Sequence, residues 1–156
     1  MLIKSRGFTL LELLITMAVG VILLNVAVPS MSSMMSSTRV SGAAEQIQGV
    51  LELNRTESVE QNQDVTLTFH AGSNWSVSSV ISGSNWSPGS LTSTSYKTTS
   101  LTINLSANPI TYKPTGLVSN TGTLVISDGT TSATLTFNPI GRTRICSNNI
   151  TKYPGC

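Results

Sequence analysis

The chain of 156 residues has few of the residues that carry enzyme chemistry. It contains one histidine and two cysteines, and Asp128 is the only acidic residue after Asp64. No cysteine–histidine cluster has metal-ligand spacing, and no glycine-rich loop precedes a helix. The histidine, His70, stands at the end of an expected strand, where it is typical of a structural or solvated residue. The sequence therefore predicts no catalytic residues, no metal site and no cofactor.

Charged side chains are also scarce, and they are unevenly distributed. They make up 10% of the sequence and aromatic residues 5%, but the 39% of hydrophobic residues excludes a disordered chain. Residues 8–64 carry six acids against two arginines, a net charge of −4, and residues 65–156 carry five basic residues against one acid, a net charge of +4. Such asymmetry is typical of a polyanion-binding half, although a domain that simply lacks acids has the same pattern.

The longest apolar run covers residues 8–28, with Lys4 and Arg6 before it. As a helix it would be about 31 Å long, enough to cross a bilayer once. The basic flank predicts a cytoplasmic N-terminus and an exported C-terminal part. A secretory signal peptide would need a small-x-small cleavage site after the run, which the sequence lacks. The basic leader instead ends in Gly7, so we expect cleavage between Gly7 and Phe8, which leaves the apolar helix on the mature chain.

Glu12 is the only charge within the apolar run. A carboxylate inside a membrane span costs a few kcal/mol and indicates a functional site with a cationic partner. In an assembly, the nearest cation is the α-amino group of Phe8 on a neighbouring subunit. A carboxylate close enough to the interface to stay hydrated is the alternative.

The segment Lys4-Ser-Arg-Gly-Phe-Thr-Leu-Leu-Glu-Leu13 resembles the class III signal sequence of type IV pilins and type II secretion pseudopilins. The resemblance implies cleavage after Gly7 by a prepilin peptidase and methylation of the new N-terminal Phe8. It also implies that Glu12 pairs with a neighbour's N-terminus during assembly. Pro29 stands where pilins carry a helix-kinking proline, and proline removes a helical hydrogen bond in any case.

The rest of the chain predicts an amphipathic helix followed by strands. An apolar stripe with helical spacing consists of Val40, Ala43, Ala44, Ile47 and Leu51. After Asp64 the apolar period changes to two over residues 65–69, 75–80, 101–105, 123–126 and 134–137. Residues 82–100 are rich in serine and threonine, and we interpret them as a long surface loop.

The expected fold is α+β. After a leader of residues 1–7, a long N-terminal helix has a transmembrane and filament-core half, 8–29, and an amphipathic half, 30–63. This helix packs on a small antiparallel β-sandwich-like domain, 64–156. In a chain translocated across a membrane, the two cysteines favour a Cys146–Cys156 disulfide over free thiols or half a metal site. The disulfide would close a loop of residues 146–156 and stabilise the domain by roughly 3 kcal/mol.

The densest basic cluster follows Asn138. If this segment is extended, Arg142 and Arg144 project on the same side, about 6–7 Å apart, close to the phosphate repeat of a nucleic-acid strand. Guanidinium groups bind phosphate in a preferred fork geometry, and Gly141 lets the backbone approach closely. The disulfide loop would bring Lys152 nearby, and Tyr153 would either stack on a base or pack within the loop. The candidate DNA-binding residues are Gly141, Arg142, Arg144, Lys152, Lys113 and Lys97.

The sequence Gly141-Arg-Thr-Arg144 resembles the motif of FimT-type minor pilins, a family linked to DNA binding in natural transformation. The β-rich C-terminal part is likewise similar to FimT-type and H-type minor pseudopilins. The alternative is two solvated arginines on an exposed strand edge, where charges discourage aggregation. Binding through these residues would be non-specific and directed at the phosphate backbone.

The sequence thus predicts a non-enzymatic minor type IV pilin that binds extracellular DNA and supports its uptake. Its expected partners are DNA, other pilins or pseudopilins, prepilin peptidase and the inner membrane. We expect a single-pass bacterial inner-membrane protein with a periplasmic C-terminal domain, which later joins the pilus at the cell surface. The alternatives are a type II secretion pseudopilin and a minor pilin that only primes pilus assembly.

The processing hypothesis gives a first prediction. In cells that contain a prepilin peptidase, the mature chain should begin at N-methylated Phe8, because the basic leader ends in Gly7. Mass spectrometry of the purified chain measures this N-terminus directly. Replacement of Gly7 by a bulky residue should leave the leader attached. A mature chain that begins after residue 28 would instead establish an ordinary signal peptide.

Overall fold

The structure is a computed structural model that describes residues 8–84 and 87–156. The predicted cleavage site after Gly7 lies outside the described residues. A helix, α1 (Leu10–Glu60), comes first in the chain, and strands and one short 3-10 helix follow it. The chain divides into two compact units, Met1–Met35 and Ser36–Cys156, and α1 contributes to both.

The first unit holds the N-terminal part of α1. Its described large apolar side chains are exposed, and an 18-residue window of α1 has a mean hydropathy of 2.3, so α1 is a candidate membrane span by length and composition. The helix begins after Thr9, whose Oγ1 accepts a hydrogen bond from the backbone N–H of Glu12 at 3.2 Å. Threonine followed three residues later by glutamate is a capping-box sequence. The backbone of Pro29 is helical, and the kink expected there stays a prediction.

The second unit begins with helical segment 36–60 of α1, whose apolar stripe is buried as the sequence predicted. The stripe residues Val40, Ala43, Ala44, Ile47 and Leu51 each have 0% of their surface exposed. Spacing of three and four residues places them on one face of the helix. The helix ends at Glu60, next to the predicted β domain.

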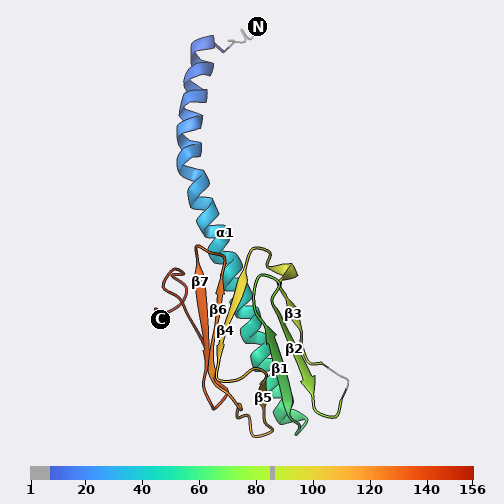
Figure 1. Cartoon of the computed structure of the whole chain (residues 1–156). Helices are drawn as coiled ribbons and strands as arrows, with labels where there is room; N and C mark the ends of the chain where they lie inside the picture. Colours follow the sequence, from blue (N-terminus) through green and yellow to red (C-terminus); the bar gives the residue numbers. More distant parts are fainter. Residues whose placement is uncertain (1–7, 85–86) are drawn as a thin grey trace, which may run out of the picture. The chain divides into compact units, whose positions relative to one another are not determined.

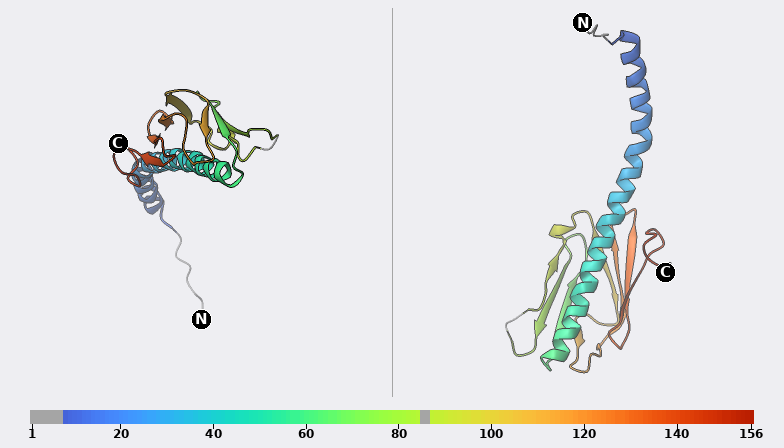
Figure 2. Two further views of the ribbon diagram at one scale, coloured as in Figure 1. Left: turned by 90° about the horizontal axis from the view of Figure 1, so that it is seen from below. Right: turned by 180° about the vertical axis from the view of Figure 1, so that it is seen from behind.

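The strands form two four-stranded antiparallel sheets. One has the order β3 (Leu91–Thr92), β2 (Ser76–Ile81), β1 (Val65–His70) and β5 (Ile110–Tyr112). The other has the order β4 (Ser100–Leu105), β6 (Gly122–Ser127), β7 (Ser132–Phe137) and β8 (Thr143–Cys146). Segment 36–60 lies along both sheets (Figures 1 and 2). The predicted α+β fold is confirmed.

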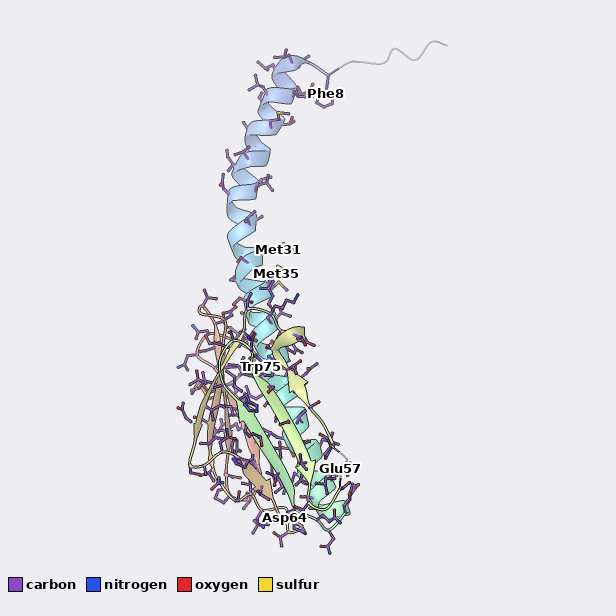
Figure 3. All side chains as sticks on the ribbon, turned by 45° about the vertical axis from the view of Figure 1, so that its right-hand side comes forward. Phe8, Met31, Met35, Glu57, Asp64 and Trp75 are labelled. Carbon is purple, nitrogen blue, oxygen red and sulfur yellow. A yellow bond between two sulfur atoms is a disulfide. The ribbon has the colours of Figure 1, made fainter. Side chains whose placement is uncertain are left out.

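The second unit has a hydrophobic core of its own. Every buried apolar side chain of the described residues lies between Val40 and Ile150. The largest is Trp75, which is fully buried and donates a hydrogen bond from Nε1 to Thr99 Oγ1 at 3.0 Å (Figure 3). A buried indole with its N–H paired adds apolar contact without an unsatisfied donor.

Three strands were not predicted from the sequence. β3 and the 3-10 helix η1 (Ser93–Ser95) lie within residues 82–100, so the prediction of one long irregular loop is wrong there. β5 has three residues and β8 four, too few for a convincing alternation of period two. These short strands are stabilised by pairing with β1, β2 and β7, which lie elsewhere in the sequence.

A polar cluster, here called the Asp128 clasp, joins the start of segment 36–60 to the turn between β6 and β7. The hydroxyl of Ser36 donates to Asp128 Oδ2 and lies 2.9 Å from Thr131 Oγ1. Asp128 Oδ1 accepts hydrogen bonds from the backbone N–H groups of Thr130 and Thr131 at 3.1 and 2.9 Å. Burial alone would raise the pKa of Asp128, but the hydrogen bonds from these residues outweigh it and lower the pKa from 3.8 to about 2.

The clasp predicts an acid-dependent loss of stability. Asp128→Asn should lower the free energy of unfolding at neutral pH by about 1–3 kcal/mol, because the amide cannot replace a charged acceptor. The wild-type contribution is complete above the unfolded pKa near 3.8 and is lost as the pH falls toward 2, since the unfolded state binds the proton first. Urea unfolding of both chains between pH 2 and 7 measures the difference. Asp64→Asn, which breaks only an exposed ion pair, is the control. A constant difference between wild type and Asp128→Asn across this range would contradict the role of the clasp.

Candidate nucleic-acid interface

The candidate arginines are presented by a tight turn between β7 and β8. Gly141 N–H donates to the Asn138 carbonyl oxygen at 2.9 Å, and Arg142 N–H donates to Asn138 Oδ1 at 2.9 Å. Asn138 N–H in turn donates to the Arg142 carbonyl oxygen at 3.2 Å. The backbone at Arg142 is therefore fixed by two hydrogen bonds to Asn138 before β8 begins, and Gly141 adds a third.

Gly141 is required at this turn for two reasons. Its φ of 75° lies in the left-handed region, where side chains are strained. A Cβ at this position would also lie 2.8 Å from the Gly116 carbonyl oxygen and 2.9 Å from Arg55 Nε. Arg55 Nε donates to the same Gly116 oxygen at 3.3 Å. The turn is thus packed against α1 through Arg55, and its close approach depends on glycine.

Arg142 and Arg144 open onto one groove. In β8, Thr143 and Ile145 are buried and Arg144 is exposed, while Arg142, just before the strand, is exposed as well. Both line a groove of about 400 Å³, together with Thr136, Asn138, Cys146, Gly155 and Cys156. The two arginines therefore share a face, as an extended backbone predicts.

Neither of these arginines forms an ion pair with an acid in the described part of the chain. Within residues 8–84 and 87–156, the ion pairs join Lys113 to Asp64 at 2.6 Å and Lys152 to Glu45 at 2.5 Å. Both guanidinium groups at the groove thus keep their full charge for an external partner. Two adjacent, unpaired guanidinium groups can bind phosphate or carboxylate oxygens.

The other candidate residues lie outside this groove. Lys113 and Lys152 are held in the ion pairs just described. Lys97 lines a separate hollow of about 270 Å³ together with Arg39 of α1. Lys152 is paired with Glu45 of α1 and is not among the residues that line the groove, so the expectation that the disulfide loop brings Lys152 into the neighbourhood of the arginines stays a prediction. A DNA-binding role of these three lysines stays a prediction.

The C-terminal loop is closed as predicted by a disulfide between Cys146 and Cys156. Tyr153 is partly buried against the hydrophobic core, and its hydroxyl donates to Glu45 Oε1. Burial, and then this hydrogen bond, raise the pKa of Tyr153. Hydrogen bonds lower the pKa of Glu45, and the bond from Lys152 has a larger effect than the bond from Tyr153.

Several residues of the site were missed in the sequence. The turn role of Asn138 has a local signal, because Asn-Pro followed by Gly indicates a turn. Arg55 and Glu45 have no such signal, since 61 residues separate Arg55 from Gly116 and 107 separate Glu45 from Lys152. At the N-terminal part of α1, Phe8 and Glu12 are exposed, and their roles in methylation and assembly stay predictions.

No group of three or more His, Cys, Asp or Glu side chains in the described part of the chain could hold a metal ion. The groove carries no acid or histidine among its lining residues. Arg142 and Arg144 are the charged side chains among these lining residues.

Two families of known proteins match the sequence. Residues 43–141 match the family described as type II transport protein GspH, and residues 2–24 match the prokaryotic N-terminal methylation motif. No curated protein sequence matches the chain significantly.

The fold is similar to that of the type IV minor pilin FimU of Pseudomonas aeruginosa in two crystal forms. The first gives a TM-score of 0.54 at 19% identity, covering 69% of this chain and 88% of FimU. The second gives a TM-score of 0.50 at 19% identity, covering 67% and 90%. Because the GspH match spans more than half of the sequence, the chain belongs to the GspH family, and its N-terminal methylation motif is that of the type IV pilin and pseudopilin class.

Proposed function

We propose that this minor pilin captures extracellular DNA through the groove at Arg142 and Arg144 and so supports DNA uptake in natural transformation. The observation that carries the proposal is that two exposed arginines without an ion-pair partner among the described residues line one groove. Before assembly, the chain is anchored in the inner membrane with its C-terminal domain in the periplasm. After cleavage by prepilin peptidase, it joins the pilus with other pilins.

The charge of the groove favours phosphate over a neutral ligand. Residues 65–156 carry five basic residues, of which Lys113 and Lys152 are paired with acids that precede residue 65. The unpaired positive charge of this half is thus concentrated on Arg142, Arg144 and Lys97. Contacts with two phosphates give a salt dependence with a slope of about −2 in log K against log salt for a duplex.

The proposed binding is independent of base sequence. The groove is lined by β7, β8, the turn between them and the disulfide, and its charged side chains are two arginines, which bind backbone phosphates regardless of the base sequence. Two cations give one subunit a modest affinity, and additional subunits of the pilus raise it through effective concentration.

The alternative is a secretion-system pseudopilin or an assembly-priming pilin without DNA binding. The match to a family described as type II transport protein GspH favours it. That match ends at Gly141, however, so the two arginines lie just beyond the shared region. Direct binding measurements must separate the two functions.

The first test of the proposal titrates labelled duplex DNA with the fragment Ser30–Cys156 at two salt concentrations. Arg142→Ala/Arg144→Ala should bind at least about tenfold more weakly, and the salt slope should fall by about 2, because two phosphate contacts are lost. Lys97→Ala/Lys113→Ala removes the same charge away from the groove and should have a smaller effect. Equal losses in the two variants would contradict a localised site, and no binding by the wild type at low salt would favour the pseudopilin function.

A second test changes the turn without changing the charge. Gly141→Ala should destabilise the fold by about 1–3 kcal/mol, because the added methyl group requires both a strained φ and a displacement of Arg55 or Gly116. DNA affinity should fall in the folded fraction, since the turn no longer places Arg142. Gly83→Ala is the matched control, because Gly83 also has a positive φ of 78° but open space around its Cβ. Unchanged DNA affinity in Gly141→Ala would show that the turn does not position the site.

A further inference from the structure

The C-terminal segment follows β8 in the sequence, and its last residues also line the groove. Gly155 and Cys156 line the groove with Arg142 and Arg144, and Cys146 joins them through the disulfide. The chain therefore leaves β8, makes a loop and returns to form a wall beside the arginines. The position of this wall determines how the groove is shaped.

Hydrogen bonds inside the loop hold its two ends together. Ser147 N–H donates to the Pro154 carbonyl oxygen at 2.9 Å, and Cys156 N–H donates to Asn148 Oδ1 at 3.0 Å. Ser147 Oγ also donates to the Ser132 carbonyl oxygen of β7 at 2.6 Å. These contacts fix the base of the loop at the sheet, but they do not reach its outer part.

The outer part of the loop packs on the core through Ile150 and Tyr153, and one carboxylate of α1 binds it through two polar contacts. Glu45 Oε1 accepts hydrogen bonds from Lys152 Nζ at 2.5 Å and from the Tyr153 hydroxyl. Lys152 also lies 5.8 Å from the centre of the Tyr153 ring, within the range of a cation–π contact. Glu45 thus joins the loop to the helix through residues other than the disulfide cysteines.

We propose that Glu45 is a positioning residue for the arginine groove, because it docks the loop of residues 147–156, whose last two residues, Gly155 and Cys156, form the wall. This inference rests on the proposed DNA-binding function. Glu45 does not line the groove and carries a charge that repels DNA. Its contribution to DNA binding is therefore structural, through Lys152 and Tyr153.

The two possible effects of Glu45 have opposite signs. If DNA affinity depends only on the electrostatic potential of the domain, Glu45→Gln should make DNA bind more tightly, because it removes a negative charge and frees Lys152. If Glu45 positions the wall, the same variant should bind DNA more weakly even though the protein has become more basic. Tyr153→Phe leaves the net charge unchanged and removes one of the two contacts, so any weakening there cannot be electrostatic.

The experiment titrates duplex DNA with the full chain in non-ionic detergent, comparing wild type, Glu45→Gln, Tyr153→Phe and the control Glu60→Gln. We expect about fivefold weaker binding for Glu45→Gln, a smaller loss for Tyr153→Phe, and unchanged or slightly tighter binding for Glu60→Gln. Amide hydrogen exchange should become faster at Tyr153 and Cys156 in Glu45→Gln while the strands keep their protection.

The outcomes separate this inference from the function on which it rests. Tighter or unchanged DNA binding by Glu45→Gln, with a wild type that binds, would overturn the positioning role and leave the proposed function intact. Unchanged exchange in the loop would also overturn the inference, because the wall would then be held without Glu45. A wild type that does not bind DNA would refute both.

Discussion

The packing of the α1 stripe onto the two sheets is the interaction on which the rest of the second unit depends. Val40, Ala43, Ala44, Ile47 and Leu51 are completely buried. Each of the three larger side chains contributes about 1.5–3 kcal/mol through burial, and the two alanines let the helix backbone approach closely. Two sheets of four strands, some only two to four residues long, bury enough apolar surface only with a helix across them. The turn at Gly141 and the loop at Tyr153 both use this helix as their support.

The arginine groove lies where the fold has a free edge. β8 is the last strand of its sheet, so its outer backbone groups have no further strand beside them. Exposed charges on such an edge prevent association with other strands, and the same charges can bind phosphate. The edge alone accounts for a pair of exposed arginines. The edge does not explain three further features of the groove. They are the fixed turn at Asn138, the glycine at 141, whose replacement would displace Arg55 or Gly116, and the wall closed by the disulfide.

The sequence predicted the features that have a local period. The helical stripe from Val40 to Leu51 and the five longer strands follow from apolar spacing, and the shared face of Arg142 and Arg144 follows from strand geometry. The disulfide was predicted because the sequence indicates that the C-terminal part of the chain is exported. The sequence could not predict the Asp128 clasp or the Glu45 contact, because Ser36 and Asp128 are 92 residues apart and Glu45 and Lys152 are 107 apart. Side-chain pairs of this kind depend on the tertiary structure, which also pairs Lys152 with Glu45.

The central claim is that DNA occupies the groove between β7, β8 and the C-terminal loop. The most direct measurement is a map of amide chemical-shift changes by NMR as a short duplex is added to the isotope-labelled fragment Ser30–Cys156. We expect saturable changes at the groove residues, above all at Asn138, Arg142, Arg144 and Gly155. Saturable changes that centre on the hollow of Arg39 and Lys97, or the absence of saturable changes at low salt, would contradict the account.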